Sequence, residues 1–221
     1  MLEFYLDSDE LEAGIDEVGR GCLAGPVYAA AVVWPKFIRD KRCEMIKDSK
    51  KLSAKKREML AEFIKEHALS YAIGIVNESE VDHINILQAS YKAMHNALDN
   101  LDMIPESILV DGDYFKTYID SRGDFVTHTC IQNGDNKYMS IACASIIAKV
   151  ARDKFITDLC EKHPILNRYD WKNNKCYGTK KHREAIKKYG LSPYHRKTFG
   201  ICKKHKVSKD FKEIKDMVVS I

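Results

Sequence analysis

The stretch Ala13-Gly14-Ile15-Asp16-Glu17-Val18-Gly19-Arg20-Gly21 decides the architecture, because an apolar segment here ends in two acids and a glycine turn. Residues 13–18 are typical of a strand, and a second apolar run, residues 27–34 (VYAAAVVW), predicts another strand that stops at Pro35. Because Asp16 and Glu17 are adjacent, a regular strand points their side chains to opposite faces. Both can serve one site only if the strand bends or Glu17 reaches around its edge.

The rest of the chain continues as strands alternating with helices. Further strands are predicted at 70–76, 108–110 and 126–131, and helices at 53–67, 84–98, 138–161, 180–189 and 208–219. Ser53 is a suitable N-cap for the first helix, and Gly190 closes the helix at 180–189. Five strands with helices between them predict an α/β protein, with a five-stranded mixed sheet flanked by helices.

Composition favours an ordinary globular protein. The chain has 221 residues, of which 45% are hydrophobic and 31% charged, so it suits one domain with a real core. No apolar run approaches the ~18 residues of a membrane helix, and the N-terminus lacks the features of a signal peptide. Seven cysteines without CxxC spacing indicate a reducing compartment, so we expect a cytoplasmic protein.

The net charge of +4 conceals a gradient along the chain. Residues 1–148 hold 16 Lys and Arg against 24 Asp and Glu, a net of −8, whereas residues 149–221 hold 20 against 8, a net of +12. An acidic body with a basic C-terminal third suits a nuclease, because carboxylates bind cations and lysines meet phosphates. A solvated lysine-rich helical surface explains the basic third equally well.

Carboxylates follow three of the predicted strands: Asp16 and Glu17 the first, Asp111 the strand at 108–110, and Asp135 the strand at 126–131. Acids at several strand ends suggest one convergent site, and oxygen ligands select hard cations such as Mg²⁺ or Mn²⁺. Two such ions ~3.5–4 Å apart can promote phosphodiester hydrolysis. Spacing alone leaves two alternatives open, surface acids near loops and a glycosidase carboxylate pair.

Ordered motifs make the sequence more specific than its acids alone. The segment GIDEVGRGCLAGPV at 14–27 resembles the opening motif of type 2 ribonucleases H, the bacterial ribonuclease HII family. The resemblance continues through DSKKL at 48–52, LVDG at 109–112, GD at 134–135, SIACASIIAKVARD at 140–153, YGTKKH at 177–182 and SPYHR at 192–196. Ordered blocks over most of a chain are far more specific than any one of them.

The resemblance implies a ribonuclease H-like catalytic domain over residues 1–200, with residues 201–221 as a basic helical tail packed on or beside it. It implies that Asp16, Glu17, Asp111 and Asp135 are the catalytic residues and bind two Mn²⁺ or Mg²⁺ ions. The implied reaction cuts the RNA strand of RNA–DNA hybrids, and cuts 5′ to ribonucleotides embedded in duplex DNA. The family's usual residues differ at Val18, Cys176 and Lys181, none of them a metal-site position.

The resemblance also indicates which residues contact the substrate. An enzyme that spares DNA must sense the 2′-OH, and a glycine-rich backbone can approach it closely, which favours Gly19, Arg20 and Gly21. The family's tyrosine, here Tyr177, packs on the ribose at the RNA–DNA junction. The remaining expected phosphate contacts are Lys50, Lys51, Lys149 and Ser140.

Each of these residues also has a structural interpretation. The glycines can simply end the strand, Tyr177 can be a half-buried turn aromatic, and the lysines can be solvated. Arg152 and Asp153 are interpreted as surface or intra-helix pairs, and His182 as structural.

Two other function classes remain: a related nuclease acting on DNA alone, and a non-catalytic nucleic-acid-binding module. The expected partners are RNA–DNA hybrid and ribonucleotide-containing duplex DNA, with no membrane, and the protein is expected to be a monomer. A sliding-clamp contact cannot be read from the sequence.

Overall fold

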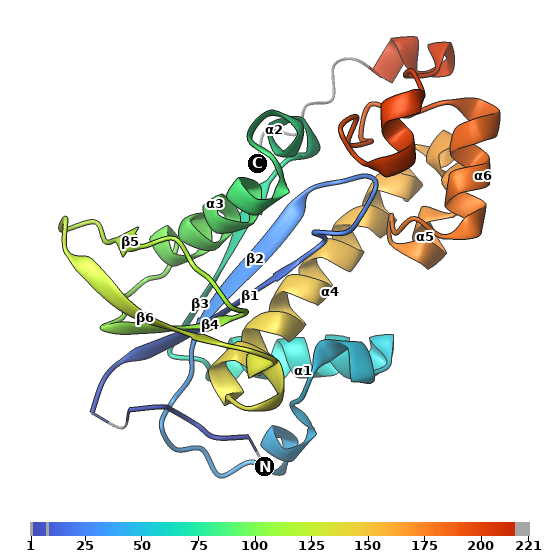
Figure 1. The fold of residues 1–221 in the computed structure, drawn as a ribbon. Coiled ribbons are helices and arrows are strands. Elements are labelled where there is room, and N and C mark those ends of the chain that lie inside the picture. The colour runs from blue at the N-terminus through green and yellow to red at the C-terminus, as the bar shows by residue number, and fades with distance from the viewer. Residues whose placement is uncertain (1, 8, 215–221) are drawn as a thin grey trace.

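A mixed sheet forms the centre of the computed structural model, which describes residues 2–7 and 9–214. Within this part of the chain the sheet has six strands in the order β3-β2-β1-β4-β6-β5 (Figure 1). The strands are β1 (Glu12–Val18), β2 (Val27–Val33), β3 (Ser70–Val76), β4 (Ser107–Asp111), β5 (Tyr118–Ile119) and β6 (Phe125–Ile131). The prediction of a mixed sheet in an α/β fold is confirmed, but the number of strands differs. The added β5 has only two residues, too few to show a sequence period.

Pairing within the sheet brings three strand ends to one edge. β1 pairs antiparallel with β2, and β2 with β3, whereas β1, β4 and β6 run parallel to one another. Ile15 lies opposite Val110, and Asp111 lies opposite Ile131. The carboxyl ends of β1, β4 and β6 are therefore neighbours.

Helices cover both faces of this sheet. The described α-helices are α1 (Ala54–His67), α2 (Glu78–Ile84), α3 (Ile86–Asp99), α4 (Met139–Lys162), α5 (Trp171–Asn174) and α6 (Lys180–Tyr189). The last two lie at the far end of α4 and do not cover the sheet (Figure 1). Short 3₁₀ helices occupy Lys41–Met45, Ser49–Lys51, Gly134–Asn136, Pro164–Tyr169, Gly200–Lys204 and Lys209–Ile214. None of the described helices is long and apolar enough to cross a lipid bilayer.

Most helix predictions are confirmed, with two corrections. Ser53 caps α1 by accepting a hydrogen bond from the Lys56 amide, and Gly190 ends α6 with a φ of +77°. The helix predicted at 84–98 begins at Ile86, because Asn85 has a φ of +66° and separates it from α2, which the sequence did not predict. The helix predicted at 208–219 is a 3₁₀ helix over Lys209–Ile214, and residues 215–219 lie outside the described residues.

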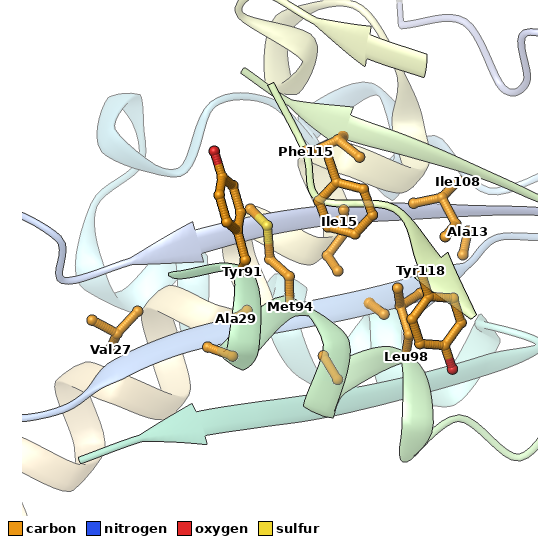
Figure 2. Packing of buried hydrophobic residues seen from close by; sticks show 14 of the residues in the cluster. Ala13, Ile15, Val27, Ala29, Tyr91, Met94, Leu98, Ile108, Phe115 and Tyr118 are labelled. Atoms are coloured by element: carbon orange, nitrogen blue, oxygen red, sulfur yellow. The ribbon is translucent and has the colours of Figure 1, made fainter. Parts of the chain in front are cut away.

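Alternation along the strands divides the main core between the two faces of the sheet. On β2, Ala29 and Ala31 belong to the cluster that α3 covers, whereas Ala30 and Val32 belong to the cluster under α1 and α4. Figure 2 shows the α3 side, where Met94 and Leu98 lie over residues of β1 and β2. Each face thus anchors its own helices.

Gly14 allows α4 to pass very close to β1. A Cβ atom at this position would lie 2.3 Å from the Ile141 amide nitrogen and 2.3 Å from the Ser140 carbonyl carbon. Only a residue without a side chain fits there. The close approach fixes how α4 lies over the end of β1.

The C-terminal helices lie at the far end of α4 (Figure 1). A third apolar cluster joins them to this helix. It contains Trp171 and Tyr169, both fully buried, and also Cys202 and Phe211. The described part of the predicted tail therefore packs on this cluster as 3₁₀ helices, while the boundary at residue 200 stays a prediction. All seven cysteines of the chain are free.

Candidate active site

The four predicted acids lie in or just after three neighbouring parallel strands. Glu17 directly follows Asp16 in β1. Asp16 is near the end of β1, Asp111 ends β4, and Asp135 lies in the 3₁₀ helix Gly134–Asn136 that follows β6. Asp16 is 8% exposed and Asp135 is 4% exposed. The register of the sheet makes the ends of β1, β4 and β6 neighbours, while the gathering of all four acids into one site stays a prediction.

The acids influence one another electrostatically. Burial raises the pKa of Asp16 well above its ordinary value, and the charges of Glu17 and Asp111 raise it further. Burial also raises the pKa of Glu17, against the opposing effect of Arg20. The pKa of Asp135 is raised by burial and then by Asp111. Ionising this group of carboxylates is therefore costly unless a cation lies among them.

Hydrogen bonds fix the orientation of three of these carboxylates. Asp16 accepts from the Glu17 amide at 2.7 Å, and Asp111 accepts from the Gly134 amide at 2.7 Å. Asp135 accepts from the Asn136 side-chain amide at 2.7 Å. The carboxylates are thus held by backbone and amide donors rather than turned freely into solvent.

Asp16 and Glu17 approach the site from opposite faces of the sheet. β1 contains no bulge, since it stays in register with β2 through the pair Val18–Tyr28. The hydroxyl of Ser145 in α4 opposes the rise in the pKa of Asp16, whereas Glu17 forms a 3.0 Å ion pair with Arg20 and interacts electrostatically with Tyr91 of α3. With no bulge to turn it, Glu17 is expected to reach the other acids around the strand edge.

The chemistry of this site fits a hard divalent cation. Its donors are carboxylate oxygens, which Mg²⁺ and Mn²⁺ prefer. Among the described residues, however, no three His, Cys, Asp or Glu side chains are gathered closely enough to form a complete ligand set as they stand. Like charges at one strand edge repel, and a cation is what would draw them together.

Two buried arginines hold the loop that follows β1. Arg152 of α4 donates to the carbonyls of Pro26 and Ala24, and Arg196 donates to those of Gly25 and Arg20. Both side chains are 0% exposed. The interpretation of Arg152 as a surface or intra-helix residue is therefore wrong.

Gly19 makes this arrangement possible. Its φ is +96°, and a Cβ atom there would lie 2.4 Å from Nε of Arg152. A side chain would therefore both strain the backbone and displace the arginine. At Gly21, by contrast, a Cβ atom would meet nothing within 4 Å, so this side of the loop is open to a ligand.

Comparison with known proteins assigns this arrangement to a family. The family model described as ribonuclease HII matches residues 13–203. The ribonuclease HII of Bacteroides thetaiotaomicron is 50% identical over 201 residues, covering 91% of this chain and 95% of that protein. The chain belongs to the ribonuclease HII family. Members of this family are metal-dependent endonucleases of the ribonuclease H type.

Solved structures agree with this assignment. The ribonuclease HII in the PCNA:RNase HII complex from Archaeoglobus fulgidus is similar, with a TM-score of 0.67, 27% identity and coverage of 86% of this chain and 95% of that one. Bst-RNase HIII in complex with Mn²⁺ shares the fold, with a TM-score of 0.67, 20% identity and coverage of 87% and 68%. The ribonuclease H-like fold predicted from the sequence is thereby confirmed.

Tyr177 lies beside the glycine loop that follows β1. Its backbone forms a bridge with Cys22, and its ring, 39% exposed, lies 6.0 Å from the Lys149 ammonium. His182 accounts for part of this placement, since its Nδ1 is 3.0 Å from the Tyr177 carbonyl oxygen. His182 is fully buried and lies 3.1 Å from His195, which agrees with a structural role.

The four predicted phosphate contacts fall into two groups. Lys50 and Lys51 are exposed beside the acids: Lys50 influences Asp135 electrostatically, and Lys51 donates to Asn136 at 2.5 Å. Ser140, by contrast, is only 2% exposed, and its hydroxyl has no hydrogen-bond partner within the described chain. Its packing against β1 speaks against a phosphate contact.

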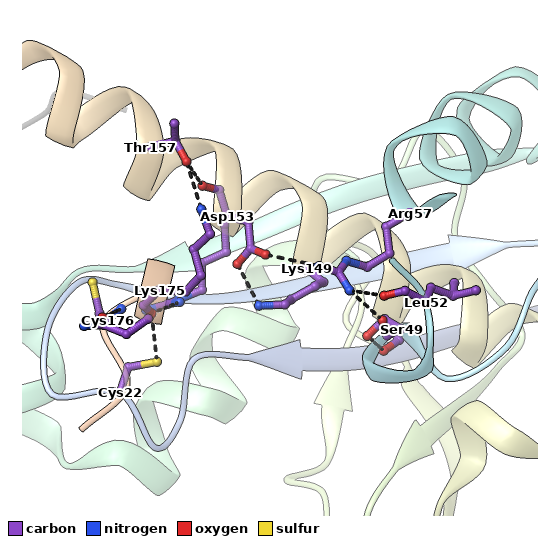
Figure 3. Close-up of polar contacts among 12 residues, drawn as sticks. Cys22, Ser49, Leu52, Arg57, Lys149, Asp153, Thr157, Lys175 and Cys176 are labelled. Carbon is purple, nitrogen blue, oxygen red and sulfur yellow. Dashed lines mark hydrogen bonds and ion pairs between the residues drawn. The ribbon is translucent and has the colours of Figure 1, made fainter. Parts of the chain in front are cut away.

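Lys149 is paired within α4 rather than free. It donates to Asp153 at 2.7 Å, and its side chain is 14% exposed. Arg57 reaches the same carboxylate and donates to the carbonyls of Ser49 and Leu52 (Figure 3). The segment Ser49–Lys51 is therefore tied to α4, the helix that also carries Lys149.

Two functional features could not be found from sequence. Asn136 connects Lys51 to Asp135, but an asparagine beside an acid carries no specific signal. Arg152 and Arg196 bind carbonyls that lie more than a hundred residues away in the chain, and no local pattern reports such a contact.

Proposed function

We propose that this protein carries out the ribonuclease HII reaction at the acid site formed by Asp16, Glu17, Asp111 and Asp135. The substrate is the RNA strand of an RNA–DNA hybrid, or a ribonucleotide embedded in duplex DNA, and cleavage falls on the 5′ side of the ribonucleotide. The observation that supports this proposal is the parallel pairing of β1, β4 and β6, which makes the strand ends that carry or precede these acids neighbours.

The four carboxylates are the proposed ligands of two Mg²⁺ or Mn²⁺ ions. When bound, such a pair activates a water molecule and stabilises the departing 3′ oxygen. Asp16 and Asp135, being buried and raised in pKa, gain most from a nearby positive charge. The hydrogen bonds from Gly134 and Asn136 orient the carboxylates of Asp111 and Asp135 before a cation binds.

The proposed selectivity for RNA depends on the loop after β1 and on Tyr177. The loop keeps a fixed shape because Arg152 and Arg196 hold its carbonyls from below, and its open side at Gly21 can approach a ribose. A backbone group placed there can exchange a hydrogen bond with the 2′-OH, which DNA lacks. Tyr177, fixed by His182, packs on the sugar from the side of α4.

Lys50 and Lys51 are proposed to meet phosphates next to this site. Both are exposed and lie near Asp135, where they also offset part of the acidic charge. Lys149 can contribute only after its bond to Asp153 opens, so we rank it below the other two.

The decisive experiment is cleavage of a DNA duplex that contains one ribonucleotide, with Mg²⁺, with Mn²⁺ and with EDTA. We expect one cut on the 5′ side of the ribonucleotide, only when a divalent ion is present. The variant Asp111→Asn should lose cleavage while it keeps most of its affinity for the duplex, because it removes metal charge and leaves the phosphate contacts. Unchanged turnover of that variant in Mg²⁺ would refute the site.

The same substrates separate the two alternative functions. A nuclease of related fold that acts on DNA alone would cut the all-DNA duplex as well. A non-catalytic binding module would bind the duplexes with no divalent-dependent cleavage.

The PCNA complex of the archaeal relative makes a clamp contact a proposal for this chain too, but no described residue is assigned to it. A monomer in the cytoplasm remains the prediction from sequence.

A further inference from the structure

We propose that Tyr114 is a stacking residue for the substrate, which packs its ring on the base or ribose of a nucleotide close to the phosphate bound at the acid site. This inference rests on the proposed function and deepens it. Tyr114 belongs to none of the motifs on which the sequence assignment depends.

Tyr114 stands in a short segment that is anchored on both sides. Before it, Gly112 has a φ of +128°, and its amide donates to the Ile131 carbonyl of β6 at 3.1 Å. After it, Phe115 is 3% exposed and packs edge-on against His128, with ring centroids 5.2 Å apart. The backbone at Tyr114 is therefore held in place by neighbours whose own positions are fixed.

The Tyr114 side chain is nevertheless 71% exposed. Its single aromatic neighbour among the described contacts is Tyr91 of α3, with ring centroids 5.9 Å apart at 54°. Tyr91 is buried, and its hydroxyl interacts electrostatically with Arg20 and Glu17. Tyr114 thus lies beside Tyr91 on the α3 side of the sheet, with most of its ring exposed.

The position of Tyr114 limits what its ring can reach. It follows the acid Asp111 by three residues, which span at most about 11 Å of extended chain. Successive nucleotides of one strand rise by about 3.4 Å, so this separation corresponds to about three nucleotide steps. A nucleotide on either side of the scissile phosphate falls within that range.

An aromatic ring suits this place because every base presents a flat π face. Stacking of a base on an aromatic side chain is tolerant of sequence and contributes about as much as a good hydrogen bond. Tyr177 flanks the acids from the side of α4, next to Lys149. Tyr114 would then support the substrate from the opposite side of the sheet.

The test compares Tyr114→Ala and Tyr114→Phe with a control at another exposed aromatic. Phe125 is 74% exposed and begins β6, whereas the acids lie at the ends of the parallel strands. For Tyr114→Ala we expect KM for the single-ribonucleotide duplex to rise roughly tenfold, with kcat within about twofold. Tyr114→Phe and Phe125→Ala should both behave like the wild type.

A fluorescence measurement distinguishes stacking from a general disturbance of the loop. The duplex carries 2-aminopurine at each of the three positions on either side of the ribonucleotide in turn, and binding is followed in the Asp111→Asn background. Quenching at one position that disappears in Tyr114→Ala and persists in Tyr114→Phe supports the proposal. Equal KM and equal fluorescence for Tyr114→Ala and wild type overturn it, as does a loss in Tyr114→Phe as large as in Tyr114→Ala. If the wild type itself fails to cut, the proposed function fails instead.

Discussion

Replacing Gly14 by alanine should move α4 away from β1. The new Cβ atom would lie 2.3 Å from backbone atoms of Ser140 and Ile141, and ordinary contact begins at 3.4 Å, so the helix must shift by about 1.1 Å. Overpacking of this kind costs about 1–3 kcal/mol. Because a shift of 1 kcal/mol moves Tm by about 2–4 °C in a protein of this size, we expect Tm to fall by about 2–12 °C.

The same displacement should impair cleavage, because α4 carries Ser145, whose hydroxyl lowers the pKa of Asp16. A misplacement of about 1 Å near a reacting centre can reduce the rate about a hundredfold. The assays are thermal unfolding by circular dichroism and kcat/KM on the single-ribonucleotide duplex. A Tm and kcat/KM equal to those of the wild type would show that the close approach of α4 and β1 is not needed. Gly21→Ala, where the added Cβ atom has no neighbour within 4 Å, is the matched control for Tm.

Four further predictions follow from particular contacts. Gly21→Ala should keep its Tm within about 1–2 °C but cut ribonucleotide substrates at least tenfold more slowly, and an unchanged rate would remove this residue from the 2′-OH contact. Tyr177→Ala should reduce cleavage of a single embedded ribonucleotide more than that of a long hybrid, so an equal loss on both substrates counts against a junction role. Asn136→Ala should weaken Mn²⁺ binding in isothermal titration, because the Asp135 carboxylate loses its 2.7 Å hydrogen bond, and an unchanged Kd rejects this positioning. Burial, and then His182, lowers the pKa of His195 to about 3, below the unfolded value of about 6.5. As the pH falls, the unfolded state therefore takes up this proton before the folded state does. The free energy of unfolding, measured with urea, should keep its full value above pH 6.5 and fall towards pH 3 by up to about 1.4 kcal/mol per pH unit. His195→Asn should reduce this pH dependence.

The sheet and its acids could be predicted because their signals are local. β1 and β4 are largely apolar segments that carry acids near their ends, β6 alternates loosely with Asp135 four residues beyond it, and parallel pairing places Asp16 beside Asp111. The position of Ser53 at the start of α1 is likewise visible, because capping depends on residues only three positions apart. Features that depend on only a few neighbouring residues can therefore be predicted from the sequence.

The parts that escaped prediction depend on contacts between distant segments. A run such as Lys149 to Asp153 has charges spaced by four residues, which indicates a solvated helix face, yet Arg152 within it is fully buried. Its partners are carbonyls at residues 24, 26 and 175, which only the tertiary fold brings into reach. The break at Asn85 was missed for a similar reason, since an asparagine with positive φ is allowed but not demanded by its neighbours.

Arg196 connects the C-terminal part of the chain to the loop that is proposed to contact the ribose. Its guanidinium reaches back across the chain to the carbonyls of Arg20 and Gly25, so the shape of the segment expected to distinguish ribose from deoxyribose is set partly by residues far downstream. An engineered minimal nuclease that ends before this arginine would retain all four acids yet lose half of the support beneath that segment. We expect the shorter protein to be less selective for ribose. Libraries that aim to broaden the substrate range could therefore vary the residues around Arg196 and leave the acids unchanged.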